Sequence, residues 1–137
     1  MSESEILELK GKKVLIVDDC NPLNEVISKF CTKWGAFPVL ANSADEMLIK
    51  SREEKPDLIL LHLHTAGMEN FDKCRDVKLS YDKSEVAILL TSSDHFELKN
   101  AVFKEPELFD DYLPKPYHIN QLYEKAVRLI YKGKLSG

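Results

Sequence analysis

Short apolar runs alternate along the chain with longer segments in which apolar residues recur every three or four positions. The runs have the length of β-strands and predict five of them, at residues 14–17, 37–41, 58–62, 85–90 and 111–113. The periodic segments predict five helices, at residues 22–34, 44–53, 71–79, 95–104 and 119–130. Residues 1–11 are polar and acidic, and we expect a short arm or one frayed helical turn there.

Helix-boundary signals support several of these limits. Asn21-Pro22 places a cap residue before a proline suited to the first turn, and Gly35 ends the apolar stripe of the first helix. Ser43-x-x-Glu46 is a capping box for the second helix. Ser93 or Asp94 is expected to cap the fourth helix.

The alternation of strands and helices predicts the fold class. The first, third and fourth strands are continuous apolar runs, which is typical of strands covered by helices on both faces. We therefore expect a parallel sheet with right-handed crossovers, in a three-layer α/β sandwich. Pro38 cannot donate a ladder hydrogen bond and favours an edge position for the second strand.

Composition narrows the class of protein. The chain has 137 residues, 44% of them hydrophobic, which is enough for one domain with a real core. A net charge of −4 argues against a generic nucleic-acid binder, and no apolar run has the ~18 residues of a membrane span. The first residues lack the apolar region of a signal peptide. Cys20, Cys31 and Cys74 form no paired motif, so we expect reduced thiols in a cytoplasmic protein.

Polar side chains follow four of the five predicted strands. They are Asp18 and Asp19, His62, Thr91 and Ser92, and Lys115. In an open parallel sheet the functional crevice lies at the carboxyl ends of the strands, so we expect these groups to converge. A solvated turn would explain any one of them alone, but not polar groups at four strand ends.

Five motifs in this order resemble one known family. They are Val14-Leu-Ile-Val-Asp-Asp19, Pro56-Asp-Leu-Ile-Leu-Leu61, Gly67-Met68, Ile88-Leu-Leu-Thr-Ser92 and Asp111-Tyr-Leu-Pro-Lys-Pro116. The chain is similar to the receiver domains of two-component response regulators over residues 12–131. We therefore expect an arm at 1–11, a tail at 132–137 and no effector domain within these 137 residues. The resemblance implies a flavodoxin-like sheet of order 2-1-3-4-5 flanked by five helices.

The resemblance also implies roles for the strand-end residues. Asp18 and Asp19 correspond to the acidic pair that holds a divalent metal ion. Thr91, with Ser92 beside it, and Lys115 correspond to the groups that contact a bound phosphoryl group. Tyr112 corresponds to the aromatic residue whose rotamer reports activation.

His62 stands where these receivers carry the phosphoryl-accepting aspartate. An imidazole is a poor ligand for Mg²⁺, so the replacement removes the acceptor and leaves at most a weak metal site at Asp18 and Asp19. We therefore expect a degenerate receiver that is not an enzyme and needs no cofactor. His62 could pair with Asp18 or Asp19, and with Lys115 neutralise them, locking one conformation. The carboxylates would raise the pKa of His62 and burial would lower it.

Three alternatives use the same crevice. His62 or a surrogate residue could accept a phosphoryl group, or the crevice could bind an anion. His62 and His64 with Asp19 could also bind a transition metal, although His64 is expected to fall in a loop.

The implied partner is a histidine kinase, a phosphotransfer protein or another regulator. We expect no binding of nucleic acid or membrane. Receivers commonly use the surface around residues 94–131, and a homodimer through it is one option. Six apolar residues there are candidate contacts or core residues: Phe96, Val102, Phe103, Leu108, Phe109 and Tyr117.

Overall fold

The computed structural model describes residues 7–19, 21–80 and 86–136. Cys20 and Glu85, which carried predictions above, lie outside these residues, as do residues 1–6 of the predicted arm. The strands are β1 (Lys13–Val17), β2 (Phe37–Ala41), β3 (Leu58–His62), β4 (Ala87–Ser92) and β5 (Asp111–Pro114). The helices are α2 (Asn21–Lys33), α3 (Ala44–Glu54), α4 (Asp72–Leu79), α5 (His95–Lys104) and α6 (Ile119–Ser136), with short 3₁₀ turns η1 (Leu7–Leu9) and η2 (Glu69–Phe71).

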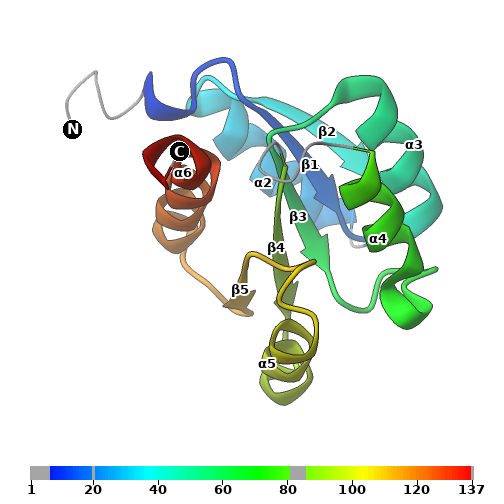
Figure 1. The fold of residues 1–137 in the computed structure, drawn as a ribbon. Helices are drawn as coiled ribbons and strands as arrows, with labels where there is room; N and C mark the ends of the chain where they lie inside the picture. The colour runs from blue at the N-terminus through cyan, green and yellow to red at the C-terminus, as the bar shows by residue number, and fades with distance from the viewer. Residues whose placement is uncertain (1–6, 20, 81–85, 137) are drawn as a thin grey trace.

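The five strands form one parallel sheet of order β2-β1-β3-β4-β5. The predicted fold class is therefore confirmed, including the edge position of β2 with its Pro38. Each crossover passes through a helix, as parallel neighbours require. The arrangement brings the carboxyl ends of the strands to one edge of the sheet, at the lower side of Figure 1.

Two apolar cores sandwich the sheet. Leu15 and Val17 belong to the core beneath α3, α4 and α5, whereas Val14 and Ile16 belong to the core beneath α2 and α6. This alternation follows from the two-residue period of a strand, and it explains why the central strands need apolar residues at every position. Figure 1 shows the two helical layers on opposite faces of the sheet.

The predicted helix caps are confirmed where the structure tests them. The hydroxyl of Ser43 accepts a hydrogen bond from the backbone N–H of Glu46, and the carboxylate of Asp94 accepts one from Glu97. Asp94, not Ser93, is thus the cap of α5. Lys55 caps the carboxyl end of α3, and its φ of 49° lies in the left-handed region that favours glycine.

The boundaries of some helices and strands differ from those predicted. β4 runs from Ala87 to Ser92 and includes the two hydroxyl residues that were expected just beyond it. The amino-terminal turn is packed and not frayed, because Leu9 is fully buried and the Tyr131 hydroxyl donates to the carbonyl of Glu8. Helix α6 continues to Ser136, beyond the predicted apolar stripe.

The remaining cysteines, Cys31 and Cys74, are buried. Burial raises the thiol pKa of both Cys31 and Cys74 to about 12, so neither is a reactive thiolate near neutral pH. None of the helices within the described ranges combines the length and the apolar character that crossing a membrane requires.

Candidate functional site

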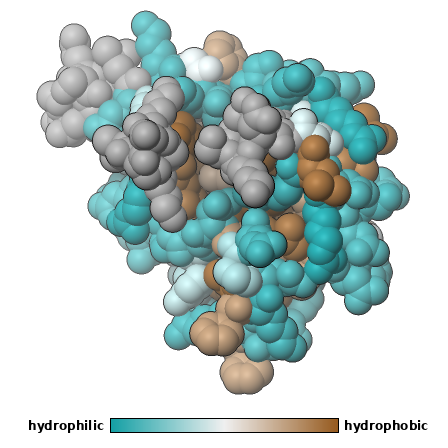
Figure 2. Space-filling view, in the orientation of Figure 1, coloured by the Kyte–Doolittle hydropathy of each residue, from teal (hydrophilic) through white to brown (hydrophobic). Residues whose placement is uncertain are grey.

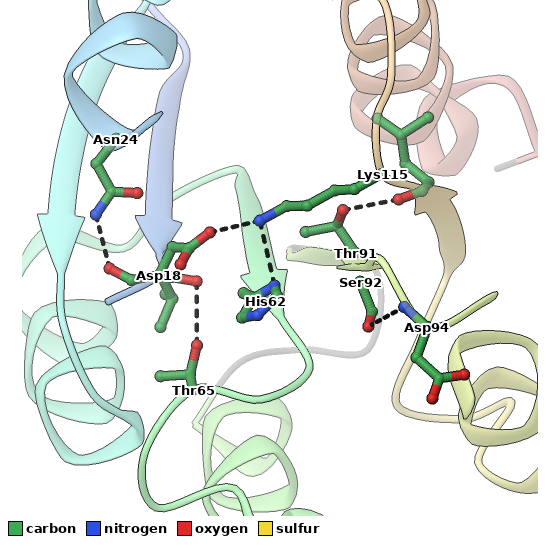
Figure 3. Close-up of polar contacts among 10 residues, drawn as sticks. Asp18, Asn24, His62, Thr65, Thr91, Ser92, Asp94 and Lys115 are labelled. Atoms are coloured by element: carbon green, nitrogen blue, oxygen red, sulfur yellow. Dashed lines mark hydrogen bonds and ion pairs between the residues drawn. The ribbon is translucent and has the colours of Figure 1, made fainter. Parts of the chain in front are cut away.

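The strand register sets the predicted residues level with one another. His62 at the end of β3 pairs with Thr91 of β4, which in turn pairs with Leu113 of β5. Lys115 follows β5 directly, and its backbone N–H donates to the carbonyl of Ser92. Asp18 leaves the end of β1 beside them, so Asp18, His62, Thr91 and Lys115 lie together at the edge of the sheet where the crevice was expected (Figure 3).

Lys115 connects the two sides of this crevice. Its Nζ lies 2.9 Å from Oδ2 of Asp18 and 3.3 Å from Nδ1 of His62 (Figure 3). The side chain of Asp18 is 7% exposed and that of Lys115 is 17% exposed, so the ion pair is largely withdrawn from water. Screening by solvent is therefore weak, and the pair is stronger than an ordinary surface salt bridge.

His62 is a neutral partner in this contact. Burial is the largest cause that lowers its pKa, and the ammonium group of Lys115 lowers it further. Asp18 and Asp19 act in the opposite direction but do not outweigh these effects. A lysine ammonium can only donate, so Nδ1 of His62 accepts the hydrogen bond and carries no proton. The sequence left the charge of His62 open, and the lowered pKa favours the neutral imidazole.

The hydroxyl groups of β4 already have partners within the chain. Thr91 is buried, and its hydroxyl donates to the carbonyl of Leu113 at 2.7 Å. Ser92 is fully buried, and its hydroxyl accepts from the backbone N–H of Asp94 at 3.0 Å. Asp94 in turn caps α5, so Ser92 links the crevice to the start of that helix.

Asp19 and Tyr112 lie apart from the Lys115 contacts. Asp19 is exposed, whereas its neighbour Asp18 is buried. Tyr112 is partly buried against the core beneath α3, α4 and α5. The ammonium of Lys125 lies 5.7 Å from the centre of its ring.

Three contacts of the site were not predicted from the sequence. The buried side chain of Asn24 donates from Nδ2 to the carbonyl of Asp18 at 2.7 Å, which fixes the backbone beside the carboxylate (Figure 3). Thr65 donates weakly to the carbonyl of Val17 at 3.5 Å. The exposed His95 lies with its Nε2 2.8 Å from the carbonyl oxygen of Lys115. Of these three residues, only Asn24 could have been suspected from the sequence, because it lies in the first turn of the helix that follows Asp18 and Asp19.

His64 forms a second connection between the crevice and α5. Its Nε2 lies 3.0 Å from Oε2 of Glu97, and its ring centre lies 5.9 Å from that of His62. His64 follows β3 in a turn, as expected. The predicted alternative of a metal site at His62, His64 and Asp19 is wrong, since no three such side chains gather as a cation site anywhere in the described part of the chain.

The residues of the crevice do not fit a strong magnesium site. Mg²⁺ prefers carboxylate, carbonyl and water oxygens. Here one carboxylate oxygen of Asp18 is bound by Lys115, and the third position holds the imidazole of His62. A metal ion at Asp18 would compete with the ammonium of Lys115 and would meet an imidazole nitrogen, not a carboxylate oxygen, at the end of β3.

Comparison with known proteins places this geometry in context. A family model described as the response regulator receiver domain matches residues 14–127. Among solved structures, a CheY-like receiver domain protein from Methanospirillum hungatei JF-1 has a TM-score of 0.81 at 23% identity, covering 93% of this chain and 100% of that one. A two-component response regulator from Clostridium difficile has a TM-score of 0.73 at 24% identity, covering 88% and 96%.

NtrX from Brucella abortus is similar over only part of its length. Its TM-score is 0.77 at 20% identity, and the match covers 92% of this chain but 28% of NtrX. At these identities the likeness of the structures establishes the fold, and the family model carries the assignment to a family.

Proposed function

This chain belongs to the response regulator receiver domain family, and on that basis we propose that it is a non-catalytic receiver that signals by protein contact without being phosphorylated. The observation that carries the proposal is the bridge from Lys115 to both Asp18 and His62. We propose that it acts in the cytoplasm and binds a histidine kinase, a phosphotransfer protein or another regulator.

The chemistry at the end of β3 supports the absence of aspartyl phosphorylation. An aspartate there would provide both the nucleophilic oxygen and a hard oxygen ligand for a metal ion. His62 provides neither, and the nearest carboxylate along β3, Asp57, lies at the opposite end of the strand. There Asp57 accepts a hydrogen bond from the backbone N–H of Lys13 at 2.9 Å.

Lys115 and Thr91, the residues that correspond to the phosphoryl-contacting groups of receivers, are already held by contacts within the chain. These contacts support a single resting arrangement of both side chains. Lys115 is neutralised by Asp18, and the hydroxyl of Thr91 is bound to the carbonyl of Leu113. An incoming phosphoryl group would have to break these contacts before it could gain its own. The crevice therefore holds its lysine and hydroxyl in place without a ligand.

Helix α5 provides the best-supported contact surface. Of the six apolar residues considered from the sequence, Phe96 and Phe103 are 80% and 87% exposed, whereas Leu108 and Phe109 are buried. Large aromatic side chains are enriched in protein interfaces. The partner surface therefore narrows from residues 94–131 to α5 and its surroundings.

Phosphodonor labelling tests the proposal. The protein is incubated with an acyl phosphate and Mg²⁺, and its intact mass is measured at neutral pH. We expect no gain of a phosphoryl group for the wild type. His62→Asp restores a carboxylate at the end of β3 and should gain one phosphoryl group. His64→Asp, two residues further on and outside the strand, is the matched control and should gain none.

Stoichiometric labelling of the wild type would contradict the proposal. Loss of that labelling in His62→Gln would identify His62 as the acceptor, and its persistence would identify a surrogate. Both results would support the alternative of a receiver that accepts a phosphoryl group.

A further inference from the structure

A groove of about 470 Å³ lies between α5 and the loop that follows β3. Its volume falls within the roughly 300–1,000 Å³ that is typical of small-molecule sites in proteins. Positions 97, 100, 101 and 104 form one wall, because residues three or four apart share a face of a helix. Residues of the range 63–71 form the other wall. Neither Asp18 nor Lys115 lines the groove, so it is a different site from the crevice at the strand ends.

The deeper part of the groove is apolar. Leu63, Met68 and Ala101 line it, and all three side chains are buried. The ring of Phe71 also lines it and lies edge-on against Phe109, with the ring centres 5.1 Å apart. Methionine sulfur and aromatic rings both make favourable contacts with a further aromatic ring. The floor of the groove is therefore suited to a planar aromatic group.

Contacts within the chain fix the two walls relative to each other. The backbone N–H of Leu63 donates to the carbonyl of Thr91 at 2.8 Å, which ties the start of the loop to β4. Nε2 of His64 lies 3.0 Å from Oε2 of Glu97 and joins the loop to α5. Because the walls are already held in place, binding of a ligand would order few additional groups.

Two opposite charges of the groove have no ionic partner of their own. Glu69 and Lys104 both line it and are exposed. Neither takes part in an ion pair within the part of the chain that the structure describes. Glu97 differs from them, because its carboxylate already contacts His64. A ligand with both a carboxylate and an ammonium group would give each of the two side chains a partner of opposite charge.

We infer that this groove binds a zwitterionic aromatic amino acid. The ring of the ligand packs on the apolar floor, its carboxylate accepts from the ammonium of Lys104, and its ammonium group donates to the carboxylate of Glu69. Such a ligand would give a receiver without an acceptor aspartate an input other than phosphorylation. That role rests on the proposed function, whereas the binding site itself does not.

The groove uses a different flank of α5 from the exposed phenylalanines. Glu97 and Lys104 each follow one of these phenylalanines, Phe96 and Phe103, by one residue, which turns the two faces by about 100° around the helix. In Figure 2, hydrophobic atoms protrude at the lower tip of the molecule, where α5 lies in Figure 1. The ligand and the protein partner proposed above would therefore contact different side chains of the same helix.

Amide NMR titration of the full chain at neutral pH tests this inference with four probes. L-Tryptophan carries the ring and both charges, indole-3-propionate lacks the ammonium group, tryptamine lacks the carboxylate, and glycine lacks the ring. We expect L-tryptophan to cause saturable shifts of the amides at 63–71 and 97–104. Indole-3-propionate and tryptamine should each bind roughly five- to tenfold more weakly, since each leaves one charged side chain without its partner. Glycine should cause no saturable shift.

Variants that remove one charge match each group of the ligand to its residue. Lys104→Met should remove the advantage of L-tryptophan over tryptamine without weakening the binding of tryptamine. Glu69→Gln should remove the advantage of L-tryptophan over indole-3-propionate without weakening the binding of indole-3-propionate. Lys99→Met and Glu25→Gln are the matched controls at exposed residues that do not line the groove. Both controls should bind L-tryptophan like the wild type.

Any of four results would overturn the inference. These are a lack of saturable shifts with L-tryptophan, shifts centred on the crevice at 17–19 and 113–116, analogues or glycine that bind as tightly as L-tryptophan, and charge variants that bind like their controls. None of these results changes the phosphodonor labelling expected for the wild type or for His62→Asp. Failure of the binding site and failure of the proposed function are therefore distinguishable.

Discussion

Replacing Lys115 by methionine keeps most of the length of the side chain but removes the ammonium group between Asp18 and His62. At 2.9 Å and an effective dielectric constant of about 20, the gross attraction to Asp18 is about 6 kcal/mol. Dehydration of both groups offsets part of it, and breaking a buried pair destabilises a protein by about 3–5 kcal/mol. The crevice is partly open to water, so we expect Lys115→Met to lower the free energy of unfolding by about 2–3 kcal/mol.

The same variant should change the titration of His62. Lys115 is the second-largest cause that lowers the pKa of His62, after burial. Without the ammonium group, the pKa should rise toward its ordinary value, and Asp18 should raise it further. Urea unfolding at neutral pH measures the loss of stability, and a proton NMR titration of the imidazole measures the pKa.

Lys13→Met is the matched control. Lys13 pairs with Glu54 at 3.3 Å, and both side chains are more than 40% exposed. Exposed pairs contribute about 0–1 kcal/mol, so this variant should lose little stability. It should leave the pKa of His62 unchanged. The reasoning fails if Lys115→Met loses no more stability than Lys13→Met, or if its His62 titrates as in the wild type.

Three further predictions concern the backbone and pH. Lys55→Gly should raise the free energy of unfolding by about 1 kcal/mol in urea titration, because Lys55 ends α3 at a φ of 49°. Gly67→Ala should lower the midpoint of thermal unfolding, with a loss of about 1–2 kcal/mol, since its φ is +86° and a Cβ would lie 3.2 Å from Cβ of Ala44. The lowered pKa of His62 means that the unfolded chain binds this proton more readily, so stability is fully present above pH 6.5 and declines as the pH falls below it. The slope should be at most about 1.4 kcal/mol per pH unit, and His62→Gln should remove that part of it, as urea unfolding at several pH values would detect.

The fold could be predicted because its signals are local. Continuous apolar runs indicate strands that are buried on both faces. Ser43 and Asp94 indicate helix starts, because each side chain accepts a hydrogen bond from the backbone only three residues further along the chain. Pro38 marked the edge strand for a similarly local reason. The packed turn at Leu9 was missed because its burial depends on contacts with α6, far along the chain.

The members of the site could be predicted, but not their contacts. Parallel topology alone brings Asp18, His62, Thr91 and Lys115 to one edge of the sheet. The pairing of these groups depends on the direction and burial of each side chain. Lys115 and Asp18, for example, are 97 residues apart in the sequence. The charge of His62 was left open for the same reason, since opposing effects of burial and neighbours had to be weighed in space. No sequence spacing indicated the contact between His64 and Glu97.

The arrangement of Lys115 between Asp18 and His62 is tested most directly by backbone amide NMR in the presence of Mg²⁺ and an acyl phosphate. The amides to follow are those of β4, α5 and β5, which surround the crevice and carry the proposed contact surface. We predict that these resonances stay unchanged in the wild type and shift in His62→Asp. A shift of the wild-type resonances that saturates with the phosphodonor would contradict a receiver locked in one state by its own side chains.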